Sequence, residues 1–360
     1  MSSLAEHFDV VIGVDTHRDT HTFAVLVAAT GAHVHTITVT ANPAGFVEAL
    51  SSIDTLTEVV QARWCWAVEG CGSWGRSLFA WLHDRDAHVV EIERPKRPRR
   101  HMGAKNDDLD AVRAAREALA ATRLPEPKTP GSKDFLAALM TARNSAVNAA
   151  TDAERQLHAL ITTAPELIAG RLRGLKTHPI IAACTSPEWV FEDAHTTAYG
   201  GVMTALARRI TALRAEADGY KTMIGEQVEI VKPELLKIVG VGPIIAATLL
   251  CSWGQPGRVR NEAAFAMLAG TAPIPASSGL TTRHRLNRFG DRRLNAAIHT
   301  VAVTRLRCDE RTKTYAKGRR AEGKTDRDIR RCLKRYITRE LADEKPATTP
   351  AAKKPRSPKK

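Results

Sequence analysis

Residues 8–17 read FDVVIGVDTH, a short apolar run that ends in an acid. Valine and isoleucine dominate the run, and such β-branched residues favour a buried strand of this length. The sequence therefore predicts a strand over residues 8–14, with the carboxylate of Asp15 just beyond its end.

The residues that follow predict an α/β domain around this strand. Runs at 22–29 and 33–40 predict two more strands, and their short links favour an antiparallel meander. Further on we expect a helix at 43–53, a strand at 64–69, a helix at about 74–85, a strand at 87–93 and a helix at about 107–121. The order β-β-β-α-β-α-β-α is that of a ribonuclease-H-like, or RuvC-like, domain, in which the first strand and the later central strand place acids side by side at one edge.

Four acids stand in three short contexts within this domain. They are Asp15 in VDTH, Glu69 in AVEG, and Asp107 with Asp110 in KNDDLDA. Residues three positions apart share one face of a helix, so the last two belong together. Carboxylates in proximity repel unless a cation lies between them, and Mg²⁺ prefers carboxylate oxygens and also binds phosphates. The pattern predicts a Mg²⁺ site, with Mn²⁺ as the alternative metal, for chemistry on a phosphodiester; each acid alone would more often cap a helix or turn.

Several polar residues lie close to these acids in the sequence. We expect His17 and His21 to be neighbours of Asp15 rather than metal ligands, and Asp108 to be solvated. Lys105 precedes the acid pair and either contacts a phosphate or is solvated.

Composition limits the class of protein. A chain of 360 residues has room for two or three domains. No stretch reaches the roughly 18 to 20 apolar residues of a membrane span, and the N-terminus lacks the layout of a signal peptide, so we expect a cytoplasmic protein. The six cysteines form no C-x-x-C pair, so we expect neither a disulfide framework nor a zinc site.

The positive charge is concentrated near the C-terminus. Residues 283–360 hold 25 Lys and Arg against 9 Asp and Glu, a net charge of +16, whereas the whole chain has +14. Such a block is expected of a protein that binds a phosphate backbone. A solubilising tail would explain residues 343–360, which we expect to be disordered, but not 283–339, where apolar residues recur at helical spacing.

The middle of the chain predicts a helical arm. Three prolines within residues 124–131 end the first domain. Helical patterns over 132–164 and about 196–231, with a broken segment between them, predict a hairpin or coiled-coil arm suited to dimerisation.

The third region begins near Pro233 and resembles a helix-hairpin-helix. Gly240 and Gly242 in VGVGP allow a tight turn whose amides can face a phosphate. Helices are expected at 261–269, 290–308 and 325–342. The predicted domains are therefore a RuvC-like catalytic domain at 1–123, a linker and arm at 124–231, a mostly helical C-terminal domain at 232–342 and a basic tail at 343–360.

A pair of serines precedes a dense group of arginines. Ser277 and Ser278 are followed by Gly279 and then by the cluster Arg283, Arg285, Arg288, Arg292 and Arg293. A serine here could attack a phosphodiester while the arginines stabilise the charged transition state. The alternative is an ordinary turn.

Ordered motifs in both halves resemble the insertion-sequence transposases with a RuvC-like DEDD domain, which include the Piv-type DNA invertases and the bridge-RNA-guided recombinases. The motifs are VDTH, AVEGCGSWG and KNDDLDA in the first half, and VGVGPIIAATLL, AAFAMLAGTAPIPASSG and RLNRFGDRRLNAAIH in the second. The resemblance extends over about residues 9–342.

The resemblance assigns roles to individual residues. The family's four acids correspond to Asp15, Glu69, Asp107 and Asp110, and its nucleophilic serine to Ser278, with Ser277 as the adjacent alternative. Two positions depart from the family pattern: Arg18 replaces the usual lysine, and Asn106 replaces Ser or Thr. Neither change removes a carboxylate.

The resemblance also implies a mechanism and partners. Ser278 would form a covalent serine–DNA intermediate while the acids hold Mg²⁺ against the same phosphate. Family members use an element-encoded noncoding RNA to pair with target and donor DNA, and they assemble as tetramers of paired dimers. Sequence choice would then rest with the RNA, while the protein reads backbone and shape.

Two other functions stay open from the sequence alone. One is a structure-selective endonuclease of the Holliday-junction type, which uses the acids and a metal-activated water without the serine. The other is a non-catalytic nucleic-acid-binding protein whose acids cap helices.

Overall fold

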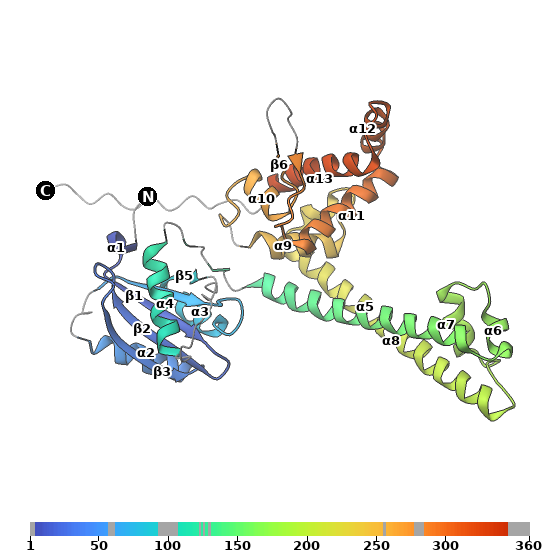
Figure 1. Ribbon diagram of the computed structural model, residues 1–360, viewed down its shortest axis with the longest axis horizontal. Helices are drawn as coiled ribbons and strands as arrows, with labels where there is room; N and C mark the ends of the chain where they lie inside the picture. Colours follow the sequence, from blue (N-terminus) through green and yellow to red (C-terminus); the bar gives the residue numbers. More distant parts are fainter. Residues whose placement is uncertain are drawn as a thin grey trace. The chain divides into compact units, whose positions relative to one another are not determined.

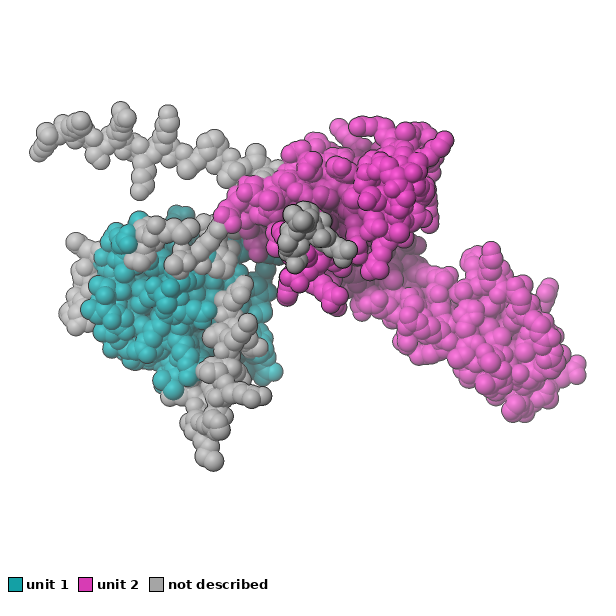
Figure 2. All heavy atoms as spheres, turned by 45° about the horizontal axis from the view of Figure 1, so that its top comes forward, with its two compact units in different colours: residues 1–130 teal, residues 131–360 magenta. Residues whose placement is uncertain are grey.

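The computed structural model describes residues 4–56, 62–92, 107–121, 124, 127–128, 131–254, 257–276 and 284–344. The chain forms two compact units, residues 1–130 and 131–360 (Figure 2). In the described ranges, no helix is both long enough and apolar enough to cross a membrane.

A five-stranded mixed sheet forms the centre of the first unit. Its strands are β1 (Val10–Thr16), β2 (Thr20–Val27), β3 (His33–Thr40), β4 (Trp64–Glu69) and β5 (His88–Ile92), in the order β3-β2-β1-β4-β5. The first three pair antiparallel, which confirms the predicted meander, whereas β4 pairs parallel with β1 and with β5. This mixed α/β architecture is compatible with the ribonuclease-H-like domain expected from the sequence.

Helices cover both faces of this sheet, as Figure 1 shows. After the short α1 (Leu4–His7), helices α2 (Pro43–Asp54) and α3 (Arg76–His83) pack on the face that carries Ile12, Phe23 and Trp66. Helix α4 (Asp107–Ala120) packs on the opposite face, against a core that includes Val11 and Ala67. Because side chains alternate along a strand, even-numbered residues of β1 face α2 and α3, and odd-numbered residues face α4.

The second unit begins with a long helical hairpin. Helices α5 (Ser132–Thr163) and α8 (Ala194–Val231) lie side by side, and α6 (Glu166–Leu172) and α7 (Thr177–Thr185) lie at the far end of the hairpin (Figure 1). Small buried residues, such as Ala153 on α5 and Ala207 on α8, leave room for the two helices to approach closely. The predicted helical hairpin is confirmed; its use in dimerisation stays a prediction.

A mostly helical region follows the hairpin. It contains a 3-10 helix, η2 (Pro233–Lys237), and the helices α9 (Pro243–Trp253), α10 (Glu262–Leu268), α11 (Arg292–Cys308), α12 (Glu310–Ala321) and α13 (Asp326–Asp343). Two-residue strands β6 (Ile274–Pro275) and β7 (His284–Arg285) pair antiparallel. The helices predicted at 261–269, 290–308 and 325–342 are confirmed, whereas α12 and the β6–β7 hairpin were not predicted.

One core joins this region to the base of the arm. Trp253 and Phe265 are fully buried there, in the same cluster as Ile298 of α11 and Leu333 of α13. Leu136 of α5 and Val228 of α8 belong to this cluster too, so the arm is anchored by apolar packing.

The segment that resembles a helix-hairpin-helix has a short first element. The five-residue η2 precedes the turn, and α9 follows it with Gly242 as its N-cap. Gly240 has φ of +86°, a backbone conformation that glycine adopts without steric cost. Its α-carbon also lies against α11, since a β-carbon there would come within 3.3 Å of Val301.

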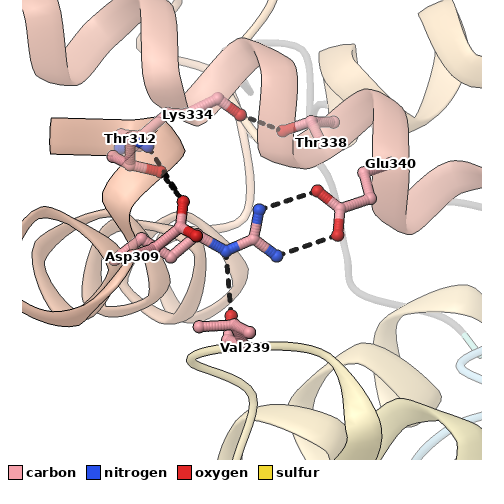
Figure 3. Close-up of polar contacts among 7 residues, drawn as sticks. Val239, Asp309, Thr312, Lys334, Thr338 and Glu340 are labelled. Atoms are coloured by element: carbon pink, nitrogen blue, oxygen red, sulfur yellow. Dashed lines mark hydrogen bonds and ion pairs between the residues drawn. The ribbon is translucent and has the colours of Figure 1, made fainter. Parts of the chain in front are cut away.

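Arg305 of α11 forms hydrogen bonds with two other segments of this region. Its Nε donates to the carbonyl oxygen of Val239 at 2.8 Å, and its two terminal nitrogens donate to Glu340 of α13 at 2.7 and 2.9 Å. Figure 3 shows this contact beside Asp309, whose carboxylate accepts from the amide of Thr312 and caps α12. The turn before α9, α11 and α13 are therefore tied by one planar side chain.

Candidate active site

Asp15 and Glu69 occupy equivalent positions at the ends of neighbouring parallel strands. Val14 of β1 is in register with Val68 of β4, so the next residue of each strand is one of the two acids. The Thr16 hydroxyl donates to the carbonyl oxygen of Glu69 at 2.8 Å and links the two strand ends. By alternation, both acids lie on the face covered by α4.

The N-terminal turn of α4 lies toward this edge of the sheet. Gly13 of β1 contacts the helix directly, since a β-carbon there would fall 2.1 Å from the carbonyl oxygen of Ala111. At the other end, Leu119 packs in the same cluster as Leu4 and Phe8, which precede β1. The helix thus runs opposite to β1, and Asp110 directly precedes the alanine that touches Gly13.

The described acids differ in environment. Asp15 is 7% exposed, and its Oδ2 lies 3.7 Å from Nδ1 of His17. Asp110 accepts a hydrogen bond from Arg113, one turn further along the helix, at 2.6 Å. Burial of a carboxylate is unfavourable unless hydrogen bonds or a cation offset the loss of water. Asp15 and Asp110 each have a basic side chain close by, His17 and Arg113 respectively.

Part of the predicted site lies outside the described residues. This applies to Lys105 and to the side chain of Asp107. Among the described side chains, no three His, Cys, Asp or Glu residues form a group that could hold a metal ion. A four-acid site thus stays a prediction, supported by the shared edge of Asp15 and Glu69 and by the first turn of α4.

The structure separates the two histidines near Asp15. His17 lies beside Asp15 as expected, and its ring is stacked with Trp74 at 6.2 Å between centroids. The expectation for His21 was wrong: it is buried on the opposite face of the sheet, stacked on Phe46 at 5.6 Å. His21 follows the short link between β1 and β2 and packs against Phe46 and Phe23. Burial lowers the pKa of His21. Asp108 is exposed, in agreement with the prediction.

A hollow of about 480 Å³ adjoins Glu69. Thr16, Trp74 and Glu91 are among the residues that line it. Trp74 is 51% exposed, and sequence reasoning did not mark it as a site residue, although it lies in the same motif as Glu69. Its ring adds apolar surface to the hollow beside Glu69.

Sequence models of protein families match two separate regions of the chain. A sequence model described as "Transposase", specific to DEDD transposases of the IS110 type, matches residues 12–164. A second, described as "Transposase IS116/IS110/IS902 family", matches residues 232–317.

The chain belongs to the IS110 family of DEDD transposases.

Two relatives of this IS110-family transposase come from insertion elements. The chain is 32% identical over 127 residues to the "Insertion element IS110 uncharacterized 43.6 kDa protein" of Streptomyces coelicolor. The matched segment covers 34% of the chain and 31% of that relative. It is 31% identical over 167 residues to the "Insertion element IS900 uncharacterized 42 kDa protein" of Mycobacterium paratuberculosis. This match covers 42% of the chain and 41% of that relative. The matched segments thus span about a third to two fifths of either relative.

The second matched region contains the predicted serine and arginines of this transposase. Ser277, Ser278 and Arg283 lie outside the described residues. Their neighbours on either side are paired, because Ile274 and Pro275 form a ladder with Arg285 and His284. Four of the predicted nucleic-acid-binding side chains are exposed, namely Arg285, Arg288, Arg292 and Arg293.

Gly240 and Gly242, in the predicted phosphate-binding turn, each have a role in the local fold. Gly240 packs on α11, as described above, and Gly242 caps α9. Contact of their amides with a phosphate remains a prediction for this transposase.

Proposed function

We propose that this chain is the DNA recombinase of an insertion sequence, which cuts and rejoins DNA strands with a divalent metal ion and a serine nucleophile. The observation that carries the proposal is the placement of Asp15 and Glu69 at adjacent strand ends on one face, toward the start of α4. Membership of a transposase family makes DNA the expected substrate.

The donor set suits a hard cation. Asp15, Glu69, Asp107 and Asp110 would hold Mg²⁺, or Mn²⁺ in its place, through carboxylate oxygens, which are the ligands that Mg²⁺ prefers. When bound, the metal would neutralise charge on the scissile phosphate and polarise it. Arg113 orients the carboxylate of Asp110, and the Thr16 hydroxyl holds the ends of β1 and β4 together.

The nucleophile in this proposal is Ser278. Its oxygen forms a bond to phosphorus while the bond from phosphorus to one sugar oxygen breaks. The serine proton passes to a base, and the released sugar oxygen takes up a proton and leaves as a hydroxyl. The arginines at 285, 288, 292 and 293, together with Lys105 and Arg283, supply cations for the phosphate backbone and the charged transition state. The amides of Gly240 and Gly242 add a phosphate contact at the start of α9.

The proposed partners follow from the resemblance. They are target and donor DNA, an element-encoded bridge RNA that pairs with both, and further copies of this chain. The α5–α8 arm is the element that we expect to hold a homodimer, two of which would form a homotetramer.

The test is a denaturing gel of the full chain with Mg²⁺, the flanking element RNA and labelled target and donor DNA. Wild type, Ser278→Ala and Asp15→Asn are compared, with Asp108→Asn as the control because Asp108 lies exposed on the same helix as Asp110. We expect a protein-linked DNA band with wild type and Asp108→Asn, and none with the other two variants.

Other outcomes would favour the competing functions. Free cut ends with both wild type and Ser278→Ala, without an adduct, would replace the serine mechanism with a water-using endonuclease of the Holliday-junction type. Rearranged DNA with Asp15→Asn would mean that Asp15 is not catalytic. Bound DNA that is neither cut nor linked with any of the proteins, wild type included, would favour a non-catalytic binding protein.

A further inference from the structure

A basic hollow of about 600 Å³ lies between β7, the loop that follows it and α13. Five cationic side chains line it: Arg285, Arg331, Lys334, Arg335 and Arg339. Among the described residues of its lining, Asp328 is the one carboxylate. The hollow therefore has a large excess of positive charge.

Neighbouring groups neutralise only part of this charge. Arg335 pairs with Glu262 of α10, and Arg331 reaches Asp328 at 3.3 Å. Within the described residues, no carboxylate forms an ion pair with Arg285 or Arg339. The hollow thus keeps cations available for an anionic ligand.

The deepest cation lacks a charged partner as well. Lys334 donates to the side-chain oxygen of Asn295, a neutral group, at 2.5 Å. Burial lowers the pKa of Lys334, and burial followed by the charge of Arg339 lowers the pKa of Arg335. Cations held close together at a loss of hydration are stabilised when an anion binds between them.

Apolar side chains accompany the cations. Tyr336 of α13 and Leu286, which follows β7, line the same hollow and are 52% and 50% exposed. Phe289, three residues after Leu286, is 97% exposed, the largest fraction among the exposed large hydrophobic residues described. Arg288 directly before it and Arg292 and Arg293, the first two residues of α11, are exposed cations. Asp291, the N-cap of α11, is the one acid among them.

The backbone around Phe289 is held in place on both sides. Asn287 is buried, donates to the carbonyl oxygen of Met267 at 3.2 Å and accepts from the amide of Phe289 at 3.0 Å. Gly290 lies against Gly270, because a β-carbon on Gly290 would fall 2.2 Å from the Gly270 nitrogen. The backbone on both sides of Phe289 is therefore held in place, and the ring is exposed to solvent.

A projecting ring among cations suits one kind of ligand. Proteins that bind single-stranded nucleic acids combine a positive groove for the backbone with aromatic side chains on which unpaired bases stack. In a duplex the faces of the bases are covered by their neighbours, so stacking on a single ring requires an unpaired or unstacked base. The hollow supplies the positive groove, and Phe289 supplies the aromatic side chain.

We propose that the hollow and Phe289 bind an unpaired segment of DNA, with backbone phosphates on Arg285 and Arg339 and a base stacked on Phe289. This inference rests on the proposed function for the choice of DNA, because the β6–β7 hairpin brackets the segment that contains Ser278. Strands freed near a cut would supply such a segment.

The test measures the affinity of the full chain for a labelled oligodeoxynucleotide by fluorescence anisotropy, without metal. We expect Phe289→Ala to weaken binding of the single strand roughly 5- to 150-fold while duplex binding of the same sequence changes little. Val190→Ala is the matched control, because Val190 is an apolar residue of the arm that is 68% exposed. Phe289→Trp should restore affinity, and its added fluorescence should be quenched when the single strand binds.

A second pair of variants tests the hollow. Arg339→Gln should reduce the slope of log affinity against log salt by about 0.7, the change expected for one phosphate contact on a single strand. Arg209→Gln, an exposed arginine on the arm, should leave the slope unchanged. Circular dichroism checks that each variant is folded.

Either of two results would overturn the inference. One is equal single-strand affinity for wild type and Phe289→Ala; the other is a larger loss on an RNA oligonucleotide than on the DNA strand, which would assign the site to RNA. Neither depends on cleavage, so the adduct assay with Asp15→Asn reports separately on the proposed function.

Discussion

Gly13 of β1 touches the backbone of Ala111 in α4: a β-carbon on Gly13 would fall 2.1 Å from the carbonyl oxygen of Ala111 and 2.6 Å from the Ala115 nitrogen. A glycine at this position lets helix and strand approach more closely than any other residue would. Asp15, two residues further along β1, and Asp110, which precedes Ala111, lie on the same side of this contact, because α4 runs opposite to β1. The contact therefore sets the distance between the strand acid and the helix acid.

Gly13→Ala should push α4 away from β1. Because backbone atoms of the helix cannot move aside as a side chain can, we expect a loss of stability of about 1–3 kcal/mol, typical of overpacking. Unfolding in urea, followed by circular dichroism, measures this loss. In Gly72→Ala, the control in the same unit, the new β-carbon meets nothing within 4 Å. Equal midpoints for the two variants would contradict the close contact.

The same substitution should impair DNA cleavage more than it impairs DNA binding. A displaced α4 moves Asp110 relative to Asp15, and an error of about 1 Å in a catalytic arrangement can cost around 100-fold in rate. Adduct formation by Gly13→Ala at a temperature where the variant is folded, compared with its affinity for DNA, separates the two effects. Full adduct yield would show that the position of α4 does not govern the chemistry.

His21 makes the stability of the first unit dependent on pH. Burial lowers the pKa of this histidine below its ordinary 6.5, so the unfolded chain binds a proton before the folded chain does. Stability is therefore fully present above pH 6.5 and is lost as the pH falls below 6.5 toward the lowered pKa of the folded state.

The variant His21→Phe should remove this part of the pH dependence. A phenyl ring keeps the stacking on Phe46 and cannot be protonated, so wild type and variant should differ most at the lower pH. Urea midpoints measured above and below pH 6.5 give the comparison, with His83→Gln, an exposed position of the same unit, as the control. A difference between wild type and His21→Phe that is constant with pH would contradict the assignment.

Replacing Arg305 by lysine should destabilise the second unit. Its side chain is 12% exposed and makes three hydrogen bonds, to Val239 and to both oxygens of Glu340. Lysine cannot reproduce the planar fork, so Arg305→Lys should cost about 1–3 kcal/mol of stability, the range for hydrogen bonds to charged groups left unmade.

An exposed pair supplies the comparison for Arg305. Arg320 and Asp326 form an ion pair in which both side chains are more than half exposed, so Arg320→Lys should cost at most about 0.5 kcal/mol. A double-mutant cycle of Arg305→Lys with Glu340→Gln then isolates the coupling between the two residues. Equal losses for the two lysine variants would show that the three-way link contributes little.

Much of the first unit could be predicted because its signals are local. The β-branched runs of β1 to β3 and the short links between them indicate a meander, and acids that end parallel strands meet at one edge whatever the details. The contact of Gly13 with Ala111 could not be foreseen, since it depends on how two elements nearly 100 residues apart pack together.

The features that sequence reasoning missed lack such local signals. Helix α12 reads ERTKTYAKGRRA, with few apolar residues to reveal a helical period, and it is held by packing of Ala316 and by its Asp309 cap. The β6–β7 hairpin has two residues in each strand, too few for an alternating pattern. Phe289 looks like any core aromatic in the sequence, and only its surroundings reveal that it faces solvent.

The cysteines offer a direct check on which surfaces are buried. Burial raises the pKa of Cys65 and Cys71 to about 12 and that of Cys184 to about 11, so almost none of these thiols is ionised at neutral pH. The thiolate is the reactive form, and burial also blocks access of a reagent to these thiols.

Cys308, at the end of α11, is exposed. Brief treatment of the folded chain with iodoacetamide, followed by peptide mass spectrometry, should therefore modify Cys308 first and leave the three buried thiols unmodified until the chain is denatured. Early modification of Cys65 or Cys71 would mean that the sheet opens, and with it the edge that carries Asp15 and Glu69.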